Sequence, residues 1–175
     1  MKRTPAFVLP LVAALAGCQT IDEIPNERLG QATLRLANGL PGGSAQLLAS
    51  GAQVNISIAV VGLAPGVHGV HLHTTGSCEA PDFTSAGAHL NPDGNQHGTS
   101  NPTGPHLGDL PNITAGNGGS GTVSATLPGT REQVLAQLFD GDGTAVVVHA
   151  SADDYRTDPS GNAGGRIACG VLTRT

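Results

Sequence analysis

Short stretches of the chain alternate apolar and polar residues, which is the pattern of strands that bury one face. The clearest case is residues 54–60, VNISIAV, in which every second residue is Val or Ile. Residues 32–36 and 123–127 have the same period, and residues 44–49 have a weaker form of it. Further segments of strand length are the one around His71, residues 144–149 and residues 166–172. The pattern predicts about eight short strands.

Turns rich in glycine and proline separate these strands, for example at residues 64–66 and 116–121. Residues 134–139 are apolar but short, and they fit either a strand or one turn of helix. Two longer stretches, 74–112 and 152–165, lack periodicity, and loops of this length in a compact domain are usually functional. We therefore predict an all-β fold in one domain. It is a Greek-key antiparallel β-sandwich or flattened barrel with two long functional loops.

Composition agrees with short strands joined by many turns, because the chain has 26 Gly and 12 Pro and only 2% aromatic residues. The charge is acidic. Lys2 and Arg3 belong to the export signal described next, so six of the 8 basic residues remain in the mature chain, against 13 acids. The resulting formal charge of about −7 disfavours a nucleic-acid partner, which would call for a basic surface.

The first 18 residues, MKRTPAFVLPLVAALAGC, have the order of a bacterial export signal, with a short basic start and an apolar run too short for a membrane span. The ending LAGC resembles a lipoprotein signal-peptidase site. This resemblance implies a signal peptide at 1–17, a lipid on Cys18, a polar tether at 18–28 and a folded domain at 29–175. The mature protein would be anchored in a lipid bilayer of the cell envelope, facing the periplasm or the cell surface. The alternative is an ordinary secretory signal that happens to contain cysteine.

Two cysteines, Cys78 and Cys169, remain after Cys18 is assigned to lipid. An exported protein meets an oxidising compartment, so we expect these two to form a disulfide. This bond would tie the first long loop to the last strand. The alternative is a pair of free buried thiols.

Histidine is concentrated in one part of the chain, since six of the 7 lie between residues 68 and 106 and His149 is the seventh. Imidazole is the commonest protein ligand for zinc and copper. His71 and His73 are two apart on a predicted strand, so both face one side. His149, at the end of another strand, is a possible partner. The three imidazoles of His89, His97 and His106, with the carboxylate of Asp109, would complete a tetrahedral zinc site.

Simpler interpretations exist for single residues of this set. A lone His-x-His on a strand is weak evidence for a metal, and Asp109 alone could be a turn residue. His68 is more readily a hydrogen-bonded structural residue than a ligand. The combination favours a metal site.

The ordered motifs HGVHLH, TSAGAHLNP, QHG, HLGDLPN, VVVHASADD and GNAGGRIACGV closely resemble the copper–zinc superoxide dismutases. The resemblance covers Leu29 to the C-terminus, and it supports the fold prediction. It implies one copper and one zinc per subunit. The implied copper ligands are His71, His73, His89 and His149, and the implied zinc ligands are His89, His97, His106 and Asp109. His89 would bridge the two metals.

The resemblance also implies roles for Asp153 and Arg166. Asp153 would accept hydrogen bonds from His71 and His97, and Arg166 would draw in the superoxide anion beside copper. The implied reaction is dismutation of superoxide to oxygen and hydrogen peroxide, by a copper that cycles between two oxidation states beside a structural zinc. In this reaction His89 also carries a proton. The alternatives are a surface turn acid at 153 and an ordinary strand-end arginine at 166.

Some features leave alternatives open. The loop 152–165 is shorter than in many animal relatives, and its only basic residue is Arg156. The roles of Arg156 and Tyr155 are not evident, and a homodimer is possible. Rival functions are metal storage or delivery without turnover, a structural envelope sandwich with a vestigial site, and a copper-only enzyme. Storage would need neither Arg166 nor Asp153, which favours the enzyme.

Overall fold

The computed structural model describes residues 27–175, which form ten strands, one α-helix and one short 3-10 helix. The predicted signal peptide, Cys18 and most of the predicted tether lie outside these residues. The elements are β1 (Arg28–Leu36), β2 (Pro41–Ser50), β3 (Gln53–Val60), β4 (Gly66–His68), β5 (Val70–His73), η1 (Thr84–Ala86), β6 (Ile113–Ala115), β7 (Gly121–Leu127), α1 (Arg131–Leu138), β8 (Ala145–His149), β9 (Arg166–Val171) and β10 (Thr173–Arg174).

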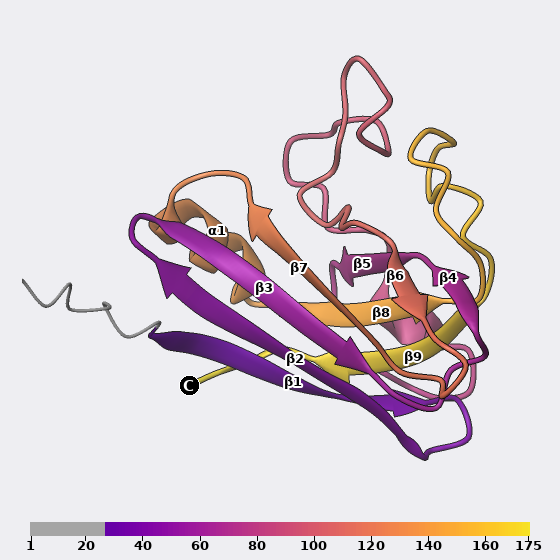
Figure 1. The fold of residues 1–175 in the computed structure, drawn as a ribbon. Helices are drawn as coiled ribbons and strands as arrows, with labels where there is room; N and C mark the ends of the chain where they lie inside the picture. Colours follow the sequence, from indigo (N-terminus) through magenta and orange to yellow (C-terminus); the bar gives the residue numbers. More distant parts are fainter. Residues whose placement is uncertain (1–26) are drawn as a thin grey trace, which may run out of the picture.

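One large antiparallel sheet carries most of the strands, in the order β5-β8-β9-β1-β2-β3-β7, with β10 beside β1. β4 and β6 form a separate two-stranded sheet. The large sheet curls on itself (Figure 1). Its inward side chains from β3, such as Ile56, belong to the same apolar core as Leu72 of β5 and Val146 of β8. The predicted all-β class and curled antiparallel architecture are confirmed.

Strand boundaries follow the alternation of the sequence where that alternation is regular. In β3, buried Val54, Ile56, Ile58 and Val60 alternate with more exposed residues. β8 is buried along its whole length, which agrees with its unbroken apolar run. The strand count exceeds the predicted eight because β4, β6 and β10 are short segments without a periodic signal. β1 also begins at Arg28, inside the predicted tether.

The ambiguous segment 134–139 belongs to a helix, α1, and not to a strand. Thr130 is its N-cap: the Thr130 hydroxyl accepts the backbone N–H of Gln133, and the Gln133 side chain accepts the backbone N–H of Thr130. This reciprocal capping box is a recognised start signal for helices. Val134 and Leu138, four residues apart, are buried against the core. No helix in residues 27–175 is long and apolar enough to cross a membrane.

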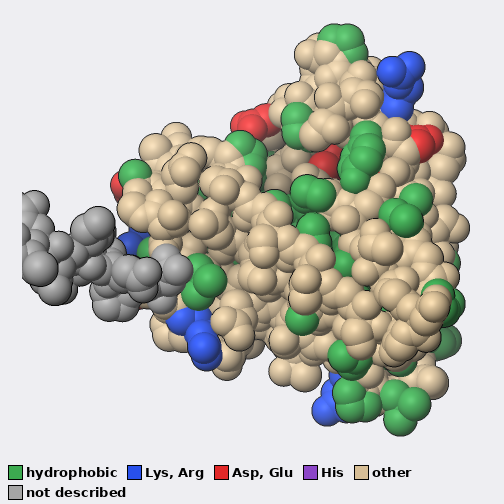
Figure 2. Space-filling view, in the orientation of Figure 1, with side chains coloured by type: hydrophobic (Ala, Val, Ile, Leu, Met, Phe, Trp, Pro, Cys, Tyr) green, Lys and Arg blue, Asp and Glu red, His purple; other side chains and the backbone are tan. Residues whose placement is uncertain are grey.

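The two predicted long loops lie between β5 and β6 and between β8 and β9. They start from opposite ends of the antiparallel β5–β8 pair, and both extend on the side of the sheet where β4, β5 and β6 lie (Figure 1). The first loop is anchored by a small apolar cluster in which Phe83 and Ala86 pack against Ala145, Val147 and Cys169. On the face drawn in Figure 2, the Lys and Arg side chains stand apart from one another and do not form one patch.

Candidate metal centre

His71 and His73 lie on β5, and the residues that alternate with them, Val70 and Leu72, pack into the main core. β5 pairs with β8, whose last residue is His149. The ring centroid of His149 is 4.8 Å from that of His71 and 5.7 Å from that of His73. The period-two alternation of strands thus turns both β5 histidines to one side. Two adjacent strands therefore bring three imidazoles together.

His89 comes from the loop between β5 and β6, and its ring lies at the centre of the cluster. It forms an isolated antiparallel bridge with His73. Its ring centroid is 3.9 Å from that of His71 and 5.2 Å from that of His97. Its Nδ1 is 3.0 Å from Oδ1 of Asp109. One imidazole therefore contacts two sets of side chains.

The predicted metal-binding residues form two groups of four that share His89. In each group, one nitrogen or oxygen atom per residue lies within 4.8 Å of the others. All the histidines are buried. The first group is His71, His73, His89 and His149, and the second group is His89, His97, His106 and Asp109. The structure thus brings together the residues of both expected ligand sets.

Asp109 gives the second group a negative charge. Its Oδ2 accepts the backbone N–H of Gly98 at 2.8 Å and that of His106 at 2.9 Å. Its Oδ1 faces Nδ1 of His89, His97 and His106 at 3.0, 3.1 and 3.1 Å. Burial alone would raise the pKa of Asp109, but the hydrogen bonds from His89, Gly98 and His106 outweigh it and lower the pKa. An ionised carboxylate facing three imidazoles suits a zinc ion.

Buried ring nitrogens without hydrogen-bond partners converge in the first group. The unpaired atoms are Nδ1 of His71 and His97 and Nε2 of His73, His89 and His149. Leaving a buried polar atom unpaired costs roughly 1–3 kcal/mol. Four of these atoms belong to the first group. The donor set therefore fits a cation that prefers imidazole, such as copper.

Hydrogen bonds to the opposite ring nitrogens fix where the protons lie. Nδ1 of His73 donates to the Gly87 carbonyl at 2.9 Å, and Nδ1 of His149 donates to the Gly164 carbonyl at 3.1 Å. A carbonyl oxygen only accepts, so each proton lies on Nδ1 and leaves the lone pair on Nε2. Both rings therefore present a metal-binding nitrogen to the first group.

Asp153 hydrogen-bonds one ring of each group. Its Oδ2 is 2.8 Å from Nε2 of His71, and its Oδ1 is 2.9 Å from Nε2 of His97. Gly161 lies against this carboxylate, and a Cβ atom there would overlap the Asp153 side chain. Burial opposes ionisation of Asp153, but the hydrogen bonds from His71 and His97 lower its pKa. The contacts are those expected for a carboxylate that orients metal ligands.

Arg166, the first residue of β9, is held beside the first group by hydrogen bonds to the loop between β5 and β6. Its Nη1 donates to the Phe83 carbonyl and its Nη2 donates to the Gly87 carbonyl, each at 2.6 Å. The Gly87 carbonyl also accepts from His73. Partial burial lowers the pKa of Arg166 from its usual high value, and an arginine remains charged at neutral pH. A fixed cation therefore lies next to the four converging nitrogens.

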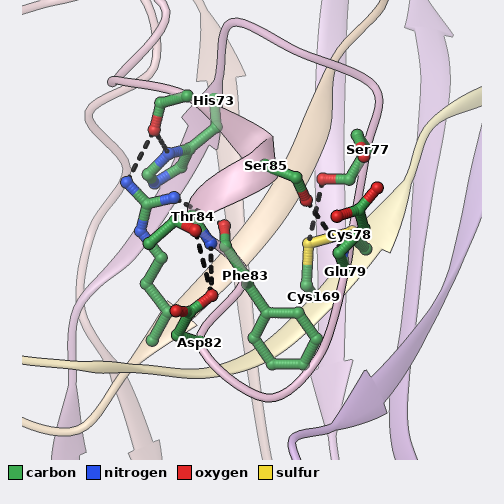
Figure 3. Close-up of a disulfide and its surroundings, with 11 residues drawn as sticks. His73, Ser77, Cys78, Glu79, Asp82, Phe83, Thr84, Ser85 and Cys169 are labelled. Carbon is green, nitrogen blue, oxygen red and sulfur yellow. Dashed lines mark hydrogen bonds between the residues drawn. A yellow bond between two sulfur atoms is a disulfide. The ribbon is translucent and has the colours of Figure 1, made fainter.

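Cys78 and Cys169 form the predicted disulfide, with a Cα–Cα distance of 5.7 Å. The bond joins the loop that carries Phe83 to β9, the strand that carries Arg166 (Figure 3).

His68 belongs to neither group. Its Nδ1 lies 2.9 Å from the His149 carbonyl and its Nε2 lies 3.0 Å from the Ala64 carbonyl, in agreement with the structural role expected for it.

Sequence reasoning missed residues that support the centre from outside it. Asn112 exchanges two hydrogen bonds with the backbone of Asp153, and the carbonyls of Gly87 and Gly164 orient two histidines. Backbone carbonyls have no sequence signal. Asn112 is the last residue of the motif HLGDLPN, which also carries Asp109, but nothing in the spacing indicates its partner.

Burial keeps several of these histidines neutral. Desolvation is the main cause that lowers the pKa of His73 to about 2, that of His89 to about 4 and that of His149 to about 3. Neighbouring positive charges, including Arg166 beside His73 and His149, act in the same direction. Neutral imidazole is the form that binds metals.

Comparisons with known proteins agree with the geometry of the two groups of metal-binding residues. The model of the copper/zinc superoxide dismutase family matches residues 42–172, and this chain belongs to that family. A protein of Aquifex aeolicus named superoxide dismutase [Cu-Zn] 2 is 43% identical over 133 residues, which is 74% of this chain and 78% of the relative. The superoxide dismutase [Cu-Zn] of Caulobacter vibrioides is 38% identical over 145 residues, covering 81% of this chain and 83% of the relative.

Solved structures share the fold. A superoxide-dismutase-like protein from Bacillus subtilis superposes with a TM-score of 0.75 at 39% identity, covering 82% of this chain and 97% of the other. The Cu/Zn superoxide dismutase from Brucella abortus superposes with a TM-score of 0.64 at 24% identity, covering 81% and 97%. At that identity the second comparison supports the fold alone.

We predict that the chelator-treated protein loses stability as the pH falls. The pKa values of His73, His89 and His149 lie below the value of about 6.5 for an unfolded chain. Below pH 6.5 the unfolded chain therefore binds more protons, and the free energy of unfolding falls until each folded-state pKa is passed, at about pH 4 for His89, about 3 for His149 and about 2 for His73. The slope is about 1.4 kcal/mol per pH unit for each proton, so these three histidines give up to about 4 kcal/mol per pH unit.

Urea unfolding at several pH values between 7.5 and 4.5 measures this slope. His149→Gln should reduce the part of the slope due to these three groups by about one third. A free energy of unfolding that does not change over this range would contradict the burial of neutral histidines.

Proposed function

We propose that the protein dismutates superoxide to oxygen and hydrogen peroxide, with copper in the first group of histidines and zinc in the second. The observation that carries the proposal is the convergence of four unpaired, buried imidazole nitrogens beside a fixed arginine. When bound, copper supplies a one-electron redox couple, and zinc supplies a fixed positive charge. Family membership supports the same reaction.

The copper ligands in this proposal are Nδ1 of His71 and Nε2 of His73, His89 and His149. The zinc ligands are Nδ1 of His89, His97 and His106 with the carboxylate of Asp109. His89 is the bridge, because its Nδ1 lies with Asp109 while its Nε2 is unpaired. Each metal would thus be held by four protein ligands, with one copper and one zinc per chain.

The chain's own residues have three tasks in this reaction. Arg166 attracts the superoxide anion and holds it beside the first group, which matters because the protein as a whole is acidic. When it does not bind copper, Nε2 of His89 would be the position at which a proton is held for delivery to the product. Asp153 and the carbonyls of Gly87 and Gly164 keep the other rings oriented, so that little reorganisation is needed.

The direct test is a metal analysis and a superoxide assay of the full chain, purified in detergent and loaded with both metals. We expect one copper and one zinc per chain, with rapid removal of superoxide. Full occupancy without superoxide removal would instead indicate storage or delivery of metal. Copper without zinc in protein purified from its own cell would indicate a copper-only enzyme.

Arg166→Ala should lower the second-order rate constant for superoxide by about 10-fold or more, because the fixed cation is lost. It should also weaken the dependence of that rate on ionic strength, while metal content stays the same. Arg131→Ala is the matched control, since Arg131 pairs with Glu27 outside the cluster. Equal rates for the Arg166 variant and the wild type would contradict the role of Arg166.

The bridge predicts a specific pattern of metal affinities. His149→Gln should weaken copper alone, His106→Gln should weaken zinc alone, and His89→Gln should weaken both, each by at least about 10-fold. Competition with chelators of known affinity measures these changes. If His89→Gln weakened only one metal, the bridge would be wrong.

We also propose that the chain is exported and lipid-anchored through Cys18, with residues 1–17 as the signal peptide and 18–28 as the tether before the enzyme domain at 29–175. The support is the sequence LAGC after a short apolar run. Its place would be the cell envelope, facing the periplasm or the cell surface. The choice between a monomer and a homodimer stays open, as in the sequence.

The full chain expressed in a bacterium should enter the detergent phase on phase separation, because acyl chains add about 0.8 kcal/mol per buried CH₂. Cys18→Ser should move it to the aqueous phase or leave the signal uncleaved, and Gln19→Ser, which keeps Cys18, should have no such effect. Mass spectrometry of the N-terminal peptide checks for the lipid. An unmodified Cys18 in the wild type would indicate an ordinary secretory signal.

A further inference from the structure

Asp153 orients His71 and His97, and it is itself held by a residue that no ligand set includes. The backbone N–H of Tyr155 donates to Oδ1 of Asp153 at 2.6 Å. This is the same oxygen that accepts from Nε2 of His97. Tyr155 thus contacts the carboxylate directly, two residues along the second loop.

The peptide groups of Asp153 are held by Asn112, at the end of the first loop. The Asp153 N–H donates to Oδ1 of Asn112, and Nδ2 of Asn112 donates to the Asp153 carbonyl, each at 2.9 Å. Asn112 follows Asp109 by three residues. The position of Asp153 therefore depends on where the first loop holds Asn112.

Tyr155 also contacts the first loop directly, which completes a cycle of hydrogen bonds among Tyr155, Asp153 and Asn112. Its phenol oxygen accepts the backbone N–H of Asn112 at 2.7 Å, and its carbonyl accepts the backbone N–H of Ser100 at 3.0 Å. A Cβ atom at Gly98 would overlap the Tyr155 carbonyl, so the two backbones are in direct contact. One residue of the second loop thus contacts the first loop at three points.

The backbone of Tyr155 is in the left-handed region, with φ of 59°. This conformation is unfavourable for a bulky aromatic residue, and it persists only where the surroundings hold it. Tyr155 also lines a cavity of about 460 Å³ together with His106 and Asp109. Tyr155 therefore lies beside the second group, in a conformation that its contacts maintain.

We propose that Tyr155 is a positioning residue for the zinc site. Through its phenol oxygen it fixes Asn112, and through Asn112 it fixes Asp153 and the ring of His97. The inference rests on the proposed function, since it assumes that the second group binds zinc. It gives a role to a side chain that neither binds metal nor contacts substrate.

Tyr155→Phe removes only the phenol oxygen and leaves the backbone contacts in place. The N–H of Asn112 then loses its acceptor, and Asn112 positions the backbone of Asp153 less firmly. Residues that orient metal ligands typically contribute about 10-fold or more to metal affinity. We expect the zinc affinity of Tyr155→Phe to fall by about 10-fold.

The matched control is Thr157→Val, which also removes one hydroxyl from the second loop. The Thr157 hydroxyl donates to Asp154 and accepts from Asn162, both within that loop, so its loss should leave zinc affinity unchanged. Zinc affinity is measured by competition with a chelator on the full chain. The visible spectrum of cobalt(II) in the zinc site reports its geometry, and it should change in Tyr155→Phe but not in Thr157→Val.

A double-mutant cycle with Asp153→Asn tests whether Tyr155 acts through Asp153. In the Asp153→Asn background, Tyr155→Phe should reduce the free energy of zinc binding by less than half of the reduction that it causes in the wild type. The inference is overturned if Tyr155→Phe stays within about twofold of the wild-type zinc affinity, or if the two losses are additive. A wild-type chain that binds no zinc would instead overturn the proposed function.

Discussion

The shared carboxylate of Asp153 is the interaction on which the centre depends. It hydrogen-bonds one ring from each group, His71 and His97, and the other nitrogen of each ring, Nδ1, is buried without a hydrogen-bond partner. His71 is on a strand, His97 is on the first loop and Asp153 is on the second loop. The two loops therefore have to be placed against each other before either group is complete. Burying neutral histidines costs free energy, and the hydrogen bonds to Asp153 and to the Gly87 and Gly164 carbonyls offset part of this cost.

The sheet and the loops each supply part of this centre. β5 and β8 are buried, paired strands, and they hold three imidazoles in a register that cannot slip without exposing Val70 and Leu72. The loops supply the remaining groups, and they are made rigid by local contacts: the Phe83 cluster, the disulfide and the hydrogen bonds around Asn112. The long loops are thus ordered parts of the site, fastened to a stable frame.

Much of the fold was predictable because it rests on periodic burial. The alternation in residues 54–60 identified β3, and the spacing of His71 and His73 identified a strand with two imidazoles on one face. The short elements had no such signal: β6 is three residues long, and α1 was ambiguous until its capping box at Thr130 and Gln133 was recognised. The support of the site was harder to predict. Asn112 makes one hydrogen bond to Tyr155 and two to Asp153 across about 40 residues of chain, and no periodicity in the sequence reveals such pairs.

The Gly87 carbonyl accepts hydrogen bonds from both His73 and Arg166. One peptide unit therefore governs two properties that an engineer would wish to adjust separately, namely the electronic character of the copper-side imidazole and the attraction felt by an incoming anion. Gly87 has φ of 76°, and an added Cβ would collide with neighbouring hydroxyls, so side-chain substitution there offers little freedom. Among variants of this loop, redox behaviour and substrate capture should consequently change together.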